Sequence, residues 1–170
     1  MKYILIISIV VIFGYVGFKQ KQKIIKQKIL IENIIEYITF YDSNLSVFKT
    51  NLFEINSKYI IMQNNKNANN ISFITKNAGL FEYNYNFLKK SLSNLMELNL
   101  IIRYFENIGK LDYDTEKEKS NEILRVLSTT KQKLNDEIKS KGDLYFKLLL
   151  SIGAVIAIVI WWTYGSFDSF

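Results

Sequence analysis

Two apolar runs, one near each end of the chain, restrict its fold more than any other feature. Residues 3–18 and residues 148–164 contain no charged side chain. Each run is slightly shorter than the about 20 residues that cross a bilayer as an α-helix, so flanking lysines would reach out to the headgroups. We therefore predict membrane anchors at residues 1–19 and 147–170, with a middle segment of residues 20–146 between them.

The second run has the stronger membrane signature. It ends in an aromatic cluster, Trp161, Trp162 and Tyr164, which suits the headgroup region of a bilayer. It also carries small residues that let another helix approach closely, namely Ser151, Gly153, Ala154 and Ala157. This small-residue face is compatible with a homo-oligomer.

The positive charges beside the runs predict how the chain lies in the membrane. Lysines close to a span stay on the cytoplasmic side, and several follow the first run before any acidic residue: Lys19, Lys21, Lys23, Lys26 and Lys28. Lysines also outnumber acids before the second run, whereas Asp168 is the only charged side chain after it. We expect the middle segment to be cytoplasmic and both termini to lie outside.

A cleaved secretory signal is the alternative interpretation of the first run, because Lys2 before an apolar stretch also begins such signals. Signal cleavage normally needs small residues after the apolar stretch, whereas Gly17 and Phe18 lead directly into the lysines. The sequence therefore favours an uncleaved anchor.

The composition argues against an enzyme. The chain has no cysteine, histidine or proline, which excludes thiol catalysis, histidine acid-base chemistry and most metal sites. None of its glycines forms a phosphate-binding loop. The acid pairs Glu116 with Glu118 and Asp112 with Asp114 are the remaining candidates for carboxylate catalysis, but a di-metal site in a helical bundle needs Glu-x-x-His motifs. We predict no catalytic residue, no cofactor and no metal.

The net charge of +6 raises the alternative of nucleic-acid binding. The lysines, however, concentrate beside the apolar runs, where membrane topology and anionic headgroups account for them. Only Arg103 and Arg125 offer the guanidinium groups that read bases and phosphates well. We therefore expect membrane lipid, and no nucleic acid, as a partner. A receptor is a further alternative, but the predicted topology leaves no outside domain for sensing.

Hydrophobic periodicity predicts helices through most of the middle segment. The first anchor helix should continue to about Tyr41, where Asp42, Ser43 and Asn44 interrupt it, and a second helix should cover residues 45–59. An asparagine-rich loop is expected at residues 64–70, followed by short amphipathic pieces at 71–74 and 80–88. Ser91 is a suitable N-cap for a helix over residues 92–106.

The segment Glu106–Asp112 is the most informative part of the chain. Gly109 suits a left-handed C-cap, Leu111 can fold back on the helix end, and Asp112 or Asp114 can begin the next helix. Thr115 and Glu118 also have capping-box spacing. The pattern predicts a tight helix-turn-helix.

After this turn an apolar stripe runs to the second anchor: Ile123, Leu127, Leu134, Ile138, Tyr145 and Leu149. No breaker stronger than Gly142 interrupts it, so the last helix should exceed 40 residues. We predict an all-α fold, a membrane-anchored antiparallel helical bundle with one transmembrane helix at each end.

This layout resembles the stage III sporulation protein AB family of endospore-forming bacteria. In that family a helix ends in an aromatic residue, three variable residues, leucine-glycine, two residues and aspartate, which here correspond to Tyr104, Ile108, Gly109 and Asp112. A signature of the related F-type inner-membrane platform proteins of type II secretion and type IV pilus systems matches Glu106, Gly109, Lys110, Leu111 and Asp112. Tyr145 and Lys147 before the second anchor are also similar. Ile108 replaces the usual leucine, Phe105 the first glycine, and Glu116 a common glutamine.

The resemblance implies a non-enzymatic platform in the secretion-like channel between mother cell and forespore, in the outer forespore membrane. Its partners would be other subunits of that channel, including a cytoplasmic motor ATPase. The candidate docking turn consists of Glu106, Gly109, Lys110, Leu111 and Asp112. A platform protein of a type II secretion, type IV pilus or competence system outside sporulation is the alternative.

Overall fold

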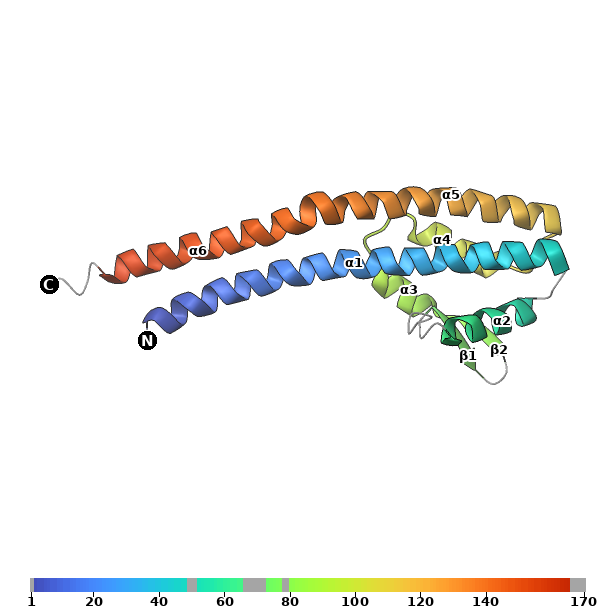
Figure 1. The fold of residues 1–170 in the computed structure, drawn as a ribbon, viewed down its shortest axis with the longest axis horizontal. Coiled ribbons are helices and arrows are strands. Elements are labelled where there is room, and N and C mark those ends of the chain that lie inside the picture. Colours follow the sequence, from blue (N-terminus) through green and yellow to red (C-terminus); the bar gives the residue numbers. More distant parts are fainter. Residues whose placement is uncertain (1, 49–51, 66–72, 78–79, 166–170) are drawn as a thin grey trace. The chain divides into compact units, whose positions relative to one another are not determined.

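The computed structural model describes residues 2–48, 52–65, 73–77 and 80–165. Within these residues the chain is mostly helical, which confirms the predicted all-α class apart from one two-stranded sheet. Figure 1 shows the elements in chain order: α1 (Lys2–Phe48), α2 (Leu52–Asn65), β1 (Ile74–Asn77), β2 (Leu80–Tyr83), α3 (Tyr85–Ser91), α4 (Leu98–Asn107), α5 (Tyr113–Glu137), a π-helical turn (Ile138–Gly142) and α6 (Asp143–Gly165).

The chain divides into two compact units. The first unit contains α1 up to Lys26 together with the chain from Lys133 onward, and the second contains residues 27–132. The second unit lies inside the middle segment predicted from the sequence. Among the residues that the structure describes, none of the helices combines the length and the apolar content needed to cross a membrane.

An aromatic cluster forms the core of the second unit. The predicted three- and four-residue spacing on α1 is confirmed, because one face of this helix is buried: Leu30, Ile31, Ile34, Tyr37, Ile38 and Tyr41. The Tyr37 ring centroid lies 5.1 Å from that of Tyr59 on α2 and 5.9 Å from those of Phe73 and of Phe105 on α4. Such aromatic pairs stabilise by about 0.5–1.5 kcal/mol beyond their buried area, so Tyr37 ties several elements together.

Helices α1 and α5 run antiparallel in the second unit, as predicted. Glu32 Oε1 lies 3.1 Å from Lys131 Nζ, near the end of the α5 part of this unit. Further along α1, Tyr41 lies close enough to Glu116, in the first turns of α5, that burial and this carboxylate together raise the pKa of its hydroxyl. The residue numbers therefore rise on one helix as they fall on the other.

The predicted interruption of the first helix after Tyr41 is wrong, because α1 continues to Phe48. The polar side chains that suggested a break bond to carbonyls one turn back instead. Ser43 Oγ donates to the Thr39 carbonyl at 2.8 Å, and Asn44 Nδ2 donates to the Phe40 carbonyl at 2.8 Å. The second helix, α2, accordingly begins only at Leu52.

The two short amphipathic pieces predicted before α3 are in part a β-hairpin. Strand β1 pairs antiparallel with β2, with Ile74 opposite Tyr83 and Asn77 opposite Leu80. Asn64 and Asn65 of the predicted loop are the last residues of α2. The rest of that loop, residues 66–70, and residues 71–72 of the first amphipathic piece lie outside the described residues.

The predicted helix over residues 92–106 is also wrong at its beginning. Ser91 is the last residue of α3, and α4 begins at Leu98. Gln27 Nε2 donates to the Ser91 carbonyl at 3.1 Å. Ser93 Oγ donates to Asn94 Oδ1 at 3.2 Å, a local side-chain bond of the kind that competes with helix formation.

The predicted long last helix is confirmed. Helix α5, the π-helical turn and α6 follow one another without a gap from Tyr113 to Gly165. The wide turn ends at Gly142, the residue singled out in the sequence as the strongest breaker of this helix. Ser140 Oγ donates to the Asp136 carbonyl at 2.6 Å within this segment.

Candidate functional site

The candidate docking turn connects α4 to α5, and Gly109 sets its shape. Gly109 has a φ of 76°, in the left-handed region that favours glycine. The Ile108 N–H donates to the Tyr104 carbonyl at 3.0 Å, and the Lys110 N–H donates to the Asn107 carbonyl at 3.1 Å. These two bonds satisfy carbonyls at the end of α4 while the chain turns at Gly109. This geometry confirms the predicted helix-turn-helix.

A second constraint on Gly109 comes from α2. A Cβ atom at this position would lie 3.1 Å from Leu52 Cδ2, which is tighter than ordinary van der Waals contact. The turn therefore packs against the first residue of α2, a long-range contact that the sequence motif does not indicate.

Asp112 is the N-cap of α5. The Thr115 N–H donates to Asp112 Oδ1 at 3.0 Å, and the Glu116 N–H donates to the Asp112 carbonyl at 2.9 Å. The hydrogen bonds to Thr115 stabilise the carboxylate and lower the pKa of Asp112. The predicted capping box of Thr115 with Glu118 is wrong, because both residues lie inside α5.

Glu116 connects the turn to α5. Its side chain is only 3% exposed, and its Oε1 accepts a short hydrogen bond from the Gly109 N–H. The same carboxylate lies near the Tyr41 hydroxyl of α1. Burial and this negative neighbour raise the pKa of Tyr41 above its usual range. One carboxylate thus ties the turn to α5 and lies beside α1.

The sequence contained a signal for Glu116 that the periodicity prediction did not use. Extending the buried stripe of Ile123 and Leu127 toward the N-terminus by helical spacing reaches Ser120 and Glu116, both of which are buried. Ser120 Oγ lies 2.9 Å from the Tyr104 hydroxyl. The buried stripe therefore begins with two polar residues, each paired with a tyrosine.

The acid pairs weighed as catalysts do not form a joint site. Glu116 is buried, whereas Glu118, two residues further along the same helix, is exposed. Asp112 and Asp114 are both exposed, and Asp112 is occupied as a cap. In the described part of the chain, no cluster of three or more histidine, cysteine, aspartate or glutamate residues could hold a metal ion.

All the residues predicted for docking lie at the surface of the second unit: Glu106, Gly109, Lys110, Leu111 and Asp112. Leu111 is 41% exposed and does not cover the helix end completely. It instead lines a pocket with Ile108, the residue that occupies the leucine position of the resembling family. The turn therefore presents two acids, one lysine and an apolar side chain within a few residues.

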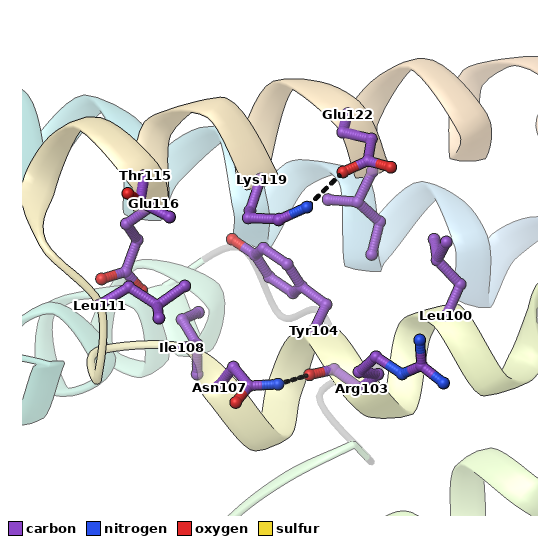
Figure 2. A pocket seen from close by; sticks show the side chains of 11 residues that line it. Leu100, Arg103, Tyr104, Asn107, Ile108, Leu111, Thr115, Glu116, Lys119 and Glu122 are labelled. Atoms are coloured by element: carbon purple, nitrogen blue, oxygen red, sulfur yellow. Dashed lines mark hydrogen bonds and ion pairs between the residues drawn. The ribbon is translucent and has the colours of Figure 1, made fainter.

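The pocket has a volume of about 360 Å³ and lies between α4 and α5, next to the turn. Its walls are mostly apolar, and Figure 2 shows Leu100, Arg103 and Tyr104 reaching it from α4 and Lys119 and Glu122 from α5. Lys119 Nζ lies 3.0 Å from Glu122 Oε2. Sequence reasoning did not find this pocket, because its walls come from two helices and the turn between them.

Comparison of the chain with models of protein families, with curated proteins and with solved structures finds no match.

Proposed function

We propose that this chain is a non-enzymatic membrane platform whose second unit docks other subunits of a secretion-like complex. The resemblance to the stage III sporulation protein AB family suggests the channel between mother cell and forespore as that complex, with a cytoplasmic motor ATPase as a partner. The observation that carries the proposal is the exposure pattern of the first unit.

Among the described side chains of the first unit, many large apolar ones are exposed, whereas three small residues are buried. Gly17 on α1 and Gly153 and Ala157 on α6 are buried. The exposed set on the same stretches includes Val11, Ile12, Tyr15, Ile152, Val155, Ile158, Val159 and Trp162. Water-soluble proteins rarely expose so many large apolar residues together, whereas membrane helices pack through small residues and present large ones to lipid.

The flanks of these stretches carry groups suited to headgroups. Lys19 Nζ lies 5.7 Å from the centre of the Tyr15 ring, a cation–π contact beside the uncharged run. Lys21 and Lys23 continue the positive charge. Aromatic rings and lysines are common where a helix leaves the bilayer on its cytoplasmic side, which supports anchors with an inward-facing middle segment.

The orientation predicts the labelling of two engineered cysteines. Because the chain has no cysteine of its own, Ser169→Cys and Asn67→Cys each introduce a single thiol. In intact cells an impermeant thiol reagent should label the first variant and leave the second unlabelled, since a membrane would separate the two sites. Lysed cells, in which both variants should react, are the control. Labelling of Asn67→Cys in intact cells would refute the proposed orientation.

The docking turn makes a separate prediction. The double substitution Glu106→Lys with Lys110→Glu reverses two exposed charges but keeps the net charge, and exposed substitutions usually change stability by less than about 0.5 kcal/mol. Association with the ATPase of the complex should fall about tenfold at low ionic strength, because charges at an interface rim govern the association rate. Binding would be measured by surface plasmon resonance at several salt concentrations.

The matched control is Glu54→Lys with Lys58→Glu on α2. Both side chains are exposed, and Lys58 Nζ lies 2.8 Å from Glu54 Oε1. Exchanging these two charges also keeps the net charge, but it alters a surface outside the turn. The control should bind normally. Equal binding by the two reversed variants at every salt concentration would show that the turn is only a helix connection.

A further inference from the structure

The pocket beside the docking turn has the size and lining of a binding site. Its volume of about 360 Å³ is within the roughly 300–1,000 Å³ of pockets that hold ligands. Ile108, Leu111 and Ile123 contribute apolar surface to it. Leu100 on α4 is 36% exposed and Leu111 on the turn is 41% exposed, so apolar surface continues from the pocket to its edges.

One positive charge at this pocket is uncompensated. Of the charged side chains that line it, Lys119 pairs with Glu122, and Glu116 accepts a hydrogen bond from the Gly109 N–H. Within the described residues, the exposed guanidinium of Arg103 has neither an ion pair nor a side-chain hydrogen bond. Figure 2 shows its side chain reaching toward Leu100, while Lys119 and Glu122 face each other on α5.

We propose that the pocket receives a segment of a partner protein that presents a leucine-like side chain next to a carboxylate, with the apolar group between α4 and α5 and the carboxylate on Arg103. This inference rests on the proposed docking function and specifies the chemistry of the partner. A planar guanidinium binds a carboxylate through two parallel hydrogen bonds, which fixes the direction of the segment as well as holding it.

A protein segment fits the observations better than a small molecule. The pocket is open, and Leu111, an exposed residue of the turn, is one of the side chains that line it. A partner that contacts Leu111 therefore contacts the lining of the pocket as well. Interfaces commonly combine one apolar anchor in a pocket with charged contacts around it.

The test uses the full chain in phosphatidylcholine nanodiscs and a short fluorescein-labelled helical peptide in which leucines are flanked by glutamates. Fluorescence anisotropy should show binding that weakens as salt is added. Arg103→Gln should weaken it about tenfold, the effect of losing one charge-assisted pair. Arg125→Gln removes the other arginine of the chain, which is exposed on α5 and does not line the pocket, and should bind like the unchanged protein.

Two further comparisons separate the apolar contact from the charge. A peptide with glutamine in place of glutamate should bind about as weakly as Arg103→Gln binds the original. Leu100→Ser should weaken binding of both peptides, whereas Ile61→Ser, at a 61% exposed position on α2, should not. Empty nanodiscs give the background.

Several results would overturn the inference: no binding of the acidic peptide, equal binding by Arg103→Gln and Arg125→Gln, or binding of octanoate without binding of the peptide. None of them decides the docking function itself. The docking function is tested by ATPase binding to the charge-reversed turn, in which Arg103 is unchanged. The pocket proposal is tested by peptide binding to the Arg103 variant, so each proposal can fail without the other.

Discussion

Raising the pH above about 10 should unfold the second unit in a steep transition. The pKa of each of five tyrosines in its core is raised, chiefly by burial: Tyr37, Tyr41, Tyr59, Tyr83 and Tyr104, with Tyr83 at about 12. The pKa of these tyrosines is higher in the folded state than in the unfolded state. The protein therefore keeps its full stability at pH values below the unfolded-state pKa of 10.0 and loses stability as the pH rises toward the folded-state pKa.

The size of the effect follows from the number of tyrosines. Each group costs about 1.4 kcal/mol for every pH unit above the unfolded pKa. Five independent groups would therefore remove about 7 kcal/mol per pH unit, and a typical domain has only about 5–15 kcal/mol of stability. The midpoint of alkaline unfolding should lie between pH 10 and about 12. Below that range the fraction of folded protein should change little.

The measurement is a pH titration that records tyrosinate absorbance and near-ultraviolet circular dichroism together. Both should change in one cooperative step. Tyr59→Phe should reduce the pH dependence of the unfolding free energy by about 1.4 kcal/mol per unit, because it removes one hydroxyl whose pKa is raised in the folded state. The bond from this hydroxyl to the Asn33 carbonyl is long, 3.4 Å, so its loss should cost little. Tyr113→Phe, at a 42% exposed position, is the control for removing a tyrosine hydroxyl outside the core. Gradual ionisation near pH 10 with the core intact would contradict the prediction.

Local chemistry explains which parts of this fold the sequence could predict. The end of α4 and the beginning of α5 depend on the φ of Gly109 and on the hydrogen bonds that Asp112 accepts from the N–H groups of Thr115 and Glu116, all within a few residues. The length of the last helix likewise follows from an unbroken apolar stripe. Such features need no knowledge of what packs against them.

The failures have non-local causes. Ser91 looks like an N-cap by its type, but it ends α3, and its carbonyl accepts a bond from Gln27, 64 positions earlier. Ser43 and Asn44 resemble helix breakers until their bonds to carbonyls one turn back are seen. The aromatic core around Tyr37 and the pocket beside the turn draw on elements far apart in the chain, and periodicity within one helix cannot assign such partners.

Glu116 is the residue of the candidate site whose loss should cost the most stability. Replacing it with leucine would leave the Gly109 N–H without its acceptor. A hydrogen bond to a charged group stabilises by about 1.5–3 kcal/mol, and a buried donor left unpaired costs a similar amount. We expect Glu116→Leu to lower the unfolding free energy by about 1.5–3 kcal/mol, measured by urea denaturation.

Glu116→Gln keeps the size of the side chain and one acceptor oxygen but removes the negative charge, so it serves as the comparison for Glu116→Leu. Its side-chain oxygen can still accept from the Gly109 N–H, so the loss should be only about 1 kcal/mol, the net value of a neutral hydrogen bond. Tyr41→Phe combined with Glu116→Leu should cost less than the sum of the two single changes, because both remove the interaction between these neighbouring side chains. Since Gly109 shapes the candidate docking turn, the leucine variant should also weaken binding of the proposed ATPase partner while the glutamine variant retains it. Equal stability of the leucine and glutamine variants would mean that the hydrogen bond from the Gly109 N–H does not stabilise the fold.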